Sequence, residues 1–124
     1  MHRLYHFVLS PFCRKVRLVL AEKKIEIELI QERYWDKSAD FLKRNPAGKV
    51  PVLKTNGFFL SDSQSICEYL EETLPTYALI PEDFVERAEV RRLVFWFDDK
   101  FYNDVTVNLL YERLTKKIVG LGQP

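Results

Sequence analysis

The stretch "LSPFCRKVRLVL" (residues 9–20) joins an apolar run to a basic run in which hydrophobic side chains recur at helical spacing. Residues 3–9 before it are apolar and rich in β-formers, which predicts a strand that ends at Pro11. Ser10 is a preferred helix N-cap, and Pro11 suits the first helical position because an N–H there would have no partner. The stretch therefore predicts a strand–turn–helix unit, with the helix extending to about residue 23.

The flanking sequence extends this unit to an α/β domain. Residues 25–30 alternate Ile25, Ile27 and Leu29 with glutamates, which predicts a half-buried strand. Residues 36–44 have helical tendency, and residues 50–60 contain Asn-Gly between two apolar runs, the pattern of a β-hairpin. A further helix is expected from about residue 61 until Pro75. The expected order is β-α-β-α-β-β-α, an α/β fold.

The remaining chain predicts a second, helical part. We expect the first domain over residues 1–76, a linker over 77–83, and the first helices of an all-α domain over 84–124. A helical pattern runs far from residue 84 onward, and a last segment, residues 109–119, is also helical before the connection "GLGQP", so one or two helices are expected. The pattern from residue 84 carries an apolar stripe made of Val90, Leu93, Phe97, Phe101 and Val105. One or two helices make a poor core, so this stripe must pack on the α/β unit or on something outside the chain.

Composition excludes several functional classes. The 124 residues carry 19 basic and 18 acidic side chains, so there is no electrostatic reason to expect nucleic acid or an anionic membrane as a partner. No run of apolar residues is long enough to span a bilayer, and no signal-peptide pattern opens the chain. Two cysteines and two histidines without paired spacing predict neither a disulfide scaffold nor a zinc site. We expect a cytoplasmic protein without a metal.

Three stretches together resemble the glutathione-binding, thioredoxin-like domain of cytosolic glutathione S-transferases. They are "SPFCRKVRLVLAEKKI" (10–25), "NPAGKVPVL" (45–53) and "SDSQSICEYLEE" (61–72), and residues 81–119 resemble the start of that family's helical domain. The resemblance implies glutathione as co-substrate with no other cofactor, a small electrophile as second substrate, and a homodimer. The family's helical domain continues beyond the point where this sequence stops, so a fragment, a processed form and a decayed gene product all stay open.

Ser10 allows two interpretations. It caps the following helix, or its hydroxyl stabilises an anion beside the unpaired N–H groups at the helix N-terminus. Several classes of the resembled family have Ser or Cys at this position and use it to stabilise the glutathione thiolate, so the resemblance makes Ser10 the catalytic candidate. Tyr5 is a rival hydroxyl, but it lies within the first strand and is interpreted as a core residue.

The cysteines are interpreted as structural. Cys13 is at the position where glutaredoxin-like relatives have the resolving cysteine, but Ser10 in the nucleophilic position excludes a dithiol–disulfide cycle within this motif. Cys13 and Cys67 are therefore expected to be buried, which is common for free cysteine. Arg14 either adds positive field near the sulfur or is an ordinary surface residue, and both possibilities stay open. Cys13 and Arg14 are possible auxiliary site residues.

The other two motifs would bind the rest of the tripeptide. The resemblance implies a cis peptide before Pro51, with the Val50 main chain pairing with the cysteinyl backbone of glutathione as an added strand would. Lys49 would reach the glycyl carboxylate, or is only a solvated lysine. Asp62 and Ser63 are helix-capping residues, or they hold the γ-glutamyl end as an acid–serine pair does in the family.

Three functions follow from these interpretations. The first is a transferase that activates glutathione for attack on a small electrophile. The second is a non-catalytic glutathione-binding or protein-interaction scaffold, and the third, which we rank last, is thiol–disulfide exchange through Cys13. The aromatic run "VRRLVFWFDDKFY" (90–102) either lines an electrophile pocket or belongs to the core, and core is the preferred interpretation.

Overall fold

The computed structural model describes residues 2–120, and the chain divides into two compact units between Leu79 and Ile80. The order of elements in the first unit confirms the α/β fold expected from the sequence, with a one-turn helix, η1, in addition. The elements are β1 (Arg3–His6), α1 (Pro11–Glu22), β2 (Glu28–Gln31), η1 (Tyr34–Asp36), α2 (Ala39–Arg44), β3 (Val52–Thr55), β4 (Phe58–Ser61) and α3 (Ser63–Thr73).

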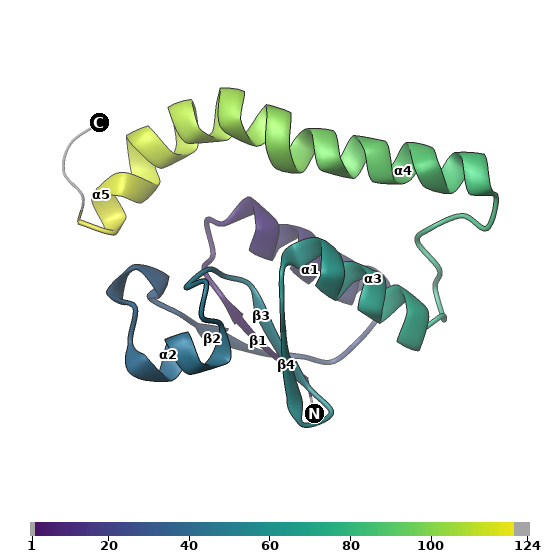
Figure 1. The fold of residues 1–124 in the computed structure, drawn as a ribbon, viewed down its shortest axis with the longest axis horizontal. Coiled ribbons are helices and arrows are strands. Elements are labelled where there is room, and N and C mark those ends of the chain that lie inside the picture. The colour runs from purple at the N-terminus through teal and green to yellow at the C-terminus, as the bar shows by residue number, and fades with distance from the viewer. Residues whose placement is uncertain (1, 121–124) are drawn as a thin grey trace. The chain divides into compact units, whose positions relative to one another are not determined.

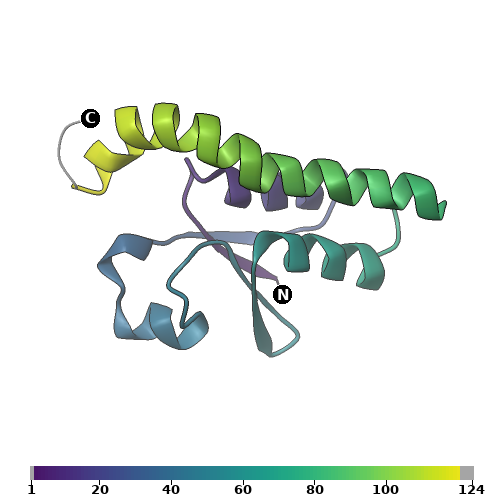
Figure 2. The same cartoon turned by 45° about the horizontal axis from the view of Figure 1, so that its top comes forward.

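The four strands form one mixed sheet in the order β2-β1-β3-β4. β1 runs parallel to β2 and antiparallel to β3, and β3 pairs with β4 through the hairpin. Helices α1 and α3 lie side by side over one face of the sheet, and α2 lies on the other face (Figures 1 and 2). This is the thioredoxin-like arrangement expected from the resemblance.

The core has two layers because successive side chains of a strand point to opposite faces of the sheet. Leu4 and Leu53 belong to the cluster on the α1 and α3 side, whereas Tyr5 and Val52 join Phe41 of α2 on the other side. Helical spacing supplies the remaining buried members of the first cluster, which are Val16 and Leu20 from α1 and Ile66, Cys67 and Leu70 from α3. The predicted burial of Cys67 is confirmed.

Two strand predictions were wrong in their extent. The first strand ends at His6 and not at residue 9, because the chain turns at residues 7–10, where the Ser10 N–H donates to the Phe7 carbonyl at 3.0 Å. β2 begins at Glu28, so Ile25 and Ile27 pack on the core before the strand starts. Leu29 was expected on the buried face but is 47% exposed, because it lies on an edge strand that the helices cover poorly.

The predicted hairpin is confirmed, and its two central residues show why. Asn56 and Gly57 have φ angles of 48° and 83°, both in the left-handed region. A two-residue turn of type I′ requires this conformation at both positions, which Asn and Gly adopt more readily than other residues.

The second unit is one continuous helix with a change of hydrogen bonding inside it. It runs through α4 (Phe84–Trp96), the π-helix η2 (Phe97–Thr115) and α5 (Lys116–Ile118), as the ribbon in Figure 1 shows. The sequence left open whether residues 84–119 form one helix or two, and the structure shows one that runs to Ile118. Gly120 adopts a φ of 80° at the helix end, as a terminating glycine does. The rest of the expected connection, residues 121–124, lies outside the described residues.

Candidate functional site

The register of the sheet brings the motif segments to one end of the first unit. Tyr5 pairs with Val52, and Val52 pairs in turn with Ser61. The turn after β1, the residues before β3 and the residues after β4 therefore all leave the sheet at the same end. Helices α1 and α3 both begin there, and Lys15 Nζ of α1 donates to Gln64 Oε1 of α3 at 3.2 Å near these two helix starts.

Ser10 caps α1, as one interpretation of the sequence predicts. Its Oγ accepts a hydrogen bond from the Cys13 N–H at 3.2 Å, and Pro11 follows as the first helical residue. This bond uses a lone pair of the oxygen and leaves the hydroxyl proton as a donor. That proton is within hydrogen-bond reach of the Cys13 thiol, and rotation about the Cβ–Oγ bond would turn it to a bound anion instead. The cap and a hydrogen bond to a bound anion are therefore compatible, and the partly exposed Ser10 can serve both.

Cys13 is placed where it is a poor nucleophile. It is fully buried, and burial raises the pKa of its thiol. The hydrogen bond from Ser10 and the charge of Arg17 lower this pKa, but by less than burial raises it. Because the thiolate is the reactive form, a buried thiol with a raised pKa reacts slowly. Arg14 lies exposed on α1, and its auxiliary role stays a prediction.

The segment before β3 presents main-chain groups that have no partner. The Val50–Pro51 peptide bond is cis, and Lys49 is exposed. Within residues 2–120, the N–H and C=O of Val50 form no hydrogen bond. Buried Asn45 holds this loop from inside, because its Nδ2 donates to the Lys49 carbonyl at 2.9 Å. The sequence analysis did not single out Asn45, although it opens the motif "NPAGK".

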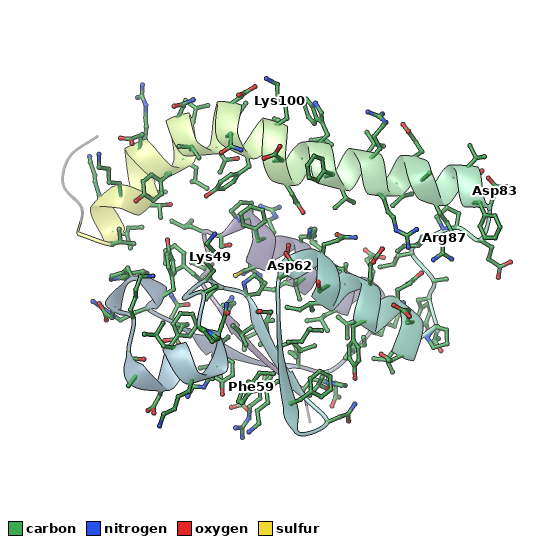
Figure 3. All side chains as sticks on the ribbon, viewed as in Figure 1. Lys49, Phe59, Asp62, Asp83, Arg87 and Lys100 are labelled. Carbon is green, nitrogen blue, oxygen red and sulfur yellow. The ribbon has the colours of Figure 1, made fainter. Side chains whose placement is uncertain are left out.

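The third segment joins β4 to α3 through a residue in an unusual conformation. Asp62 has a φ of 74°, a left-handed angle that is uncommon for a non-glycine residue and is often found at binding sites. Its carboxylate caps α3 by accepting from the Ser65 N–H at 3.0 Å and the Ser65 hydroxyl at 2.8 Å. Ser63 follows as the first residue of α3 and is 5% exposed. Lys49 and Asp62 are labelled in Figure 3.

Comparison with known proteins explains why these segments occur together. Residues 4–77 match the family model for the glutathione S-transferase N-terminal domain. The chain belongs to the glutathione S-transferase family. The match covers the sheet, its helices and every motif segment described above.

Similar proteins come from bacteria, animals and plants, and the chain spans about half of each of the three described next. FtsZ-localized protein A of Caulobacter vibrioides is 40% identical over 98% of this chain, which covers 55% of that protein. A glutathione S-transferase structure from Rhodospirillum rubrum is 49% identical and has a TM-score of 0.91. The match covers 95% of this chain and 54% of the Rhodospirillum rubrum chain. A glutathione S-transferase structure from Methylobacillus flagellatus with glutathione bound is 36% identical and has a TM-score of 0.70. The match covers 79% of this chain and 49% of the Methylobacillus flagellatus chain.

The sequence analysis missed a contact between an arginine of α1 and the end of β1. Arg17 of α1 donates from Nη1 to His6 Nδ1 at 2.9 Å and from Nη2 to the Val8 carbonyl at 3.2 Å. Burial, and secondarily the charge of Arg17, lowers the pKa of His6 below its usual 6.5. The only sequence signal is that Arg17 lies one helical turn after Cys13, on the side of α1 that faces the sheet.

Neither a metal centre nor a membrane span emerges from the described part of the chain. Among residues 2–120, no three His, Cys, Asp or Glu side chains gather in a way that would hold a metal ion. Within the same range, no helix is long and apolar enough to cross a bilayer.

Proposed function

We propose that this chain binds glutathione and activates its thiol for attack on a small electrophile. The observation that carries the proposal is the convergence of Ser10, the unpaired Val50 main chain and Ser63 at one end of the sheet, beside two helix N-termini. Membership of the family and the glutathione-bound relative from Methylobacillus flagellatus support it. Because the chain spans about half of its relatives, the part of those relatives that it does not match would supply much of the electrophile pocket.

Each motif segment would hold a different part of the tripeptide. The Val50 N–H and C=O would pair with the cysteinyl backbone, as a sheet edge pairs with an added strand. Ser63 would bind the γ-glutamyl carboxylate at the N-terminus of α3, where unpaired N–H groups favour an anion. Asp62 would face the glutamyl ammonium while keeping its capping bonds, and Lys49 would pair with the glycyl carboxylate.

Ser10 would then lower the pKa of the bound thiol. Its hydroxyl would donate a hydrogen bond to the glutathione sulfur, and the N-terminus of α1 would add a favourable field. The thiol proton is released to solvent, and the thiolate sulfur forms a bond to the electrophilic carbon. At the same carbon, either the bond to a leaving group breaks or a π bond opens and its electron pair moves to the neighbouring atom. Cys13 has no part in this sequence, since its buried thiol stays protonated.

Replacing Ser63 with alanine should weaken glutathione binding by about 1–3 kcal/mol, because a carboxylate bound in a buried setting loses its donor. An NMR titration should also show the Val50 and Ser63 amides of the unmodified chain shifting on addition of glutathione. Ser38→Ala is the matched control, since Ser38 caps α2 through the Phe41 N–H at 3.2 Å and lies outside the motif segments. If neither amide shifts, the assigned site is wrong.

A second candidate function is a glutathione-binding or protein-interaction scaffold without turnover. The observation in its favour is the 40% identity to FtsZ-localized protein A, which extends over 98% of this chain. Retention on immobilised glutathione followed by a conjugation assay, on this chain and on a longer parent, separates the two candidates. Binding without conjugation in the longer protein would favour the scaffold, and co-sedimentation with FtsZ polymers would then test that partner.

We further propose a homodimer in the cytoplasm, with residues 1–76 as the glutathione-binding domain, 77–83 as a linker and 84–124 as the start of the helical domain. Of the apolar stripe, Leu93, Phe97 and Phe101 are 42%, 53% and 37% exposed, and such a surface favours a partner. A helix that crosses its twin supplies a self-complementary patch. Sedimentation equilibrium should show a dimer, and a well-folded monomer at tens of micromolar would contradict it.

A further inference from the structure

The side chain of Arg17 joins α1 to two points on the segment that leads to Ser10. One guanidinium nitrogen contacts His6, the last residue of β1, and another donates to the Val8 carbonyl in the turn. The same turn is closed by the Ser10 N–H bond to the Phe7 carbonyl. Arg17 therefore holds the turn from the helix side, independently of the capping bond that Ser10 makes.

This contact specifies the protonation state of His6. A guanidinium group only donates hydrogen bonds, so Nδ1 of His6 must accept and the ring proton must be on Nε2. A protonated His6 would lose this acceptor and place a second positive charge about 3 Å from the Arg17 guanidinium. His6 is 8% exposed, so little water is available to reduce that repulsion.

Among residues 2–120, Arg17 is the one charged group that shifts the pKa of His6, and no acidic side chain is placed to compensate a second positive charge there. On α1 the ionisable side chain that contacts His6 is Arg17. Next to β2, the Glu32 N–H donates to the His6 carbonyl at 2.9 Å, and the Glu32 carboxylate pairs with Arg44 at 3.3 Å. The adjoining residues of β3 are uncharged.

We propose that Arg17 is a positioning residue that sets the Ser10 hydroxyl by holding the turn at residues 7–10, and that it does so only while His6 is neutral. The inference rests on the proposed function of Ser10. It adds that the position of the Ser10 hydroxyl depends on pH through His6. Because the pKa of folded His6 lies below 6.5, the stabilisation of the turn is complete above about pH 6.5. It is lost as the pH falls through the folded value.

Amide hydrogen exchange on the 124-residue chain tests the positioning without glutathione. Arg17→Gln should reduce the protection factor of the Ser10 amide on the order of fivefold near pH 7.5, the effect typical of one lost hydrogen bond. In the unmodified chain the protection should fall in a step below pH 6.5 as His6 becomes protonated. In His6→Asn the side-chain carbonyl can still accept from Arg17, so protection should persist and the step should disappear.

Three outcomes would overturn the proposal. These are unchanged Ser10 protection in Arg17→Gln, a step that persists in His6→Asn, and an equal loss in Arg3→Gln. Arg3 is the matched control because it is a β1 arginine whose pair with Glu28 is exposed and distant from the turn.

The thiol pKa of bound glutathione, followed by thiolate absorbance, tests the link to Ser10. Arg17→Gln should raise that pKa and should have no additional effect in a Ser10→Ala background, because Arg17 acts through Ser10. Additive effects of the two substitutions would overturn the link. If glutathione does not bind the unmodified chain, the proposed function fails, and hydrogen exchange still decides whether Arg17 positions the turn.

Discussion

Replacing Ser10 with alanine is expected to raise the pKa of the bound glutathione thiol by about one to two units. A hydrogen bond to a charged group contributes about 1.5–3 kcal/mol, and one pKa unit corresponds to about 1.4 kcal/mol. At neutral pH the thiolate fraction, and the conjugation rate of the longer protein with it, should fall roughly ten- to hundredfold. Thiolate absorbance against pH in the unmodified and substituted chains measures the shift.

Two comparisons make this result specific. Loss of the α1 cap should cost about 1 kcal/mol of folding stability, so thermal unfolding shows whether the variant is still folded. Cys13→Ala should leave the thiol pKa and turnover nearly unchanged, because Cys13 is buried with a raised pKa. If Cys13→Ala abolished activity and Ser10→Ala did not, thiol–disulfide exchange would replace transfer as the function.

Replacing Glu71 with alanine is expected to destabilise the first unit by about 3 kcal/mol, because it leaves a buried ammonium without its counter-ion. The Lys23 side chain is 1% exposed, and its Nζ lies 2.6 Å from Glu71 Oε1. Lys23 also donates to the Leu74 carbonyl at 2.9 Å, a bond that only partly replaces the carboxylate. Glu71 accepts in addition from the Leu79 N–H at 2.9 Å, so the variant loses a second contact.

Urea unfolding followed by circular dichroism measures this loss. Glu28→Ala removes an exposed ion pair with Arg3 and should change stability by at most about 1 kcal/mol. The double variant Lys23→Met, Glu71→Leu should recover most of the stability, because two apolar side chains of similar size need no counter-ion. A Glu71→Ala midpoint equal to that of the unmodified chain would show that water reaches Lys23 and that the pair is not buried in solution.

Local chemistry explains which parts of the fold could be predicted from the sequence. The Ser10–Pro11 cap, the Asn56–Gly57 hairpin and the helix that ends before Pro75 each depend on residues close together in the chain. The same holds for Gly120, whose positive φ ends the long helix. The three motif segments could be recognised for the same reason, because each is a short run of neighbouring residues at the start of a helix or strand.

Features that depend on contacts between distant segments could not be predicted. The alternation of residues 25–30 indicates a two-faced strand, but only the position of β2 at the sheet edge decides that Leu29 is exposed. Likewise, the apolar spacing after residue 84 indicates helix, but it does not show that one helix runs unbroken to Ile118.

The sequence by itself determined the order of elements, the caps and turns, and the family to which the site belongs. Only the tertiary structure decided that the sheet register brings the three motif segments to one end, that Arg17 meets His6, and that Lys23 is buried against Glu71. The physical reason is the same in each case. Caps and turns depend on neighbouring residues, whereas burial, pairing and pKa depend on which side chains the fold places within a few ångströms of each other.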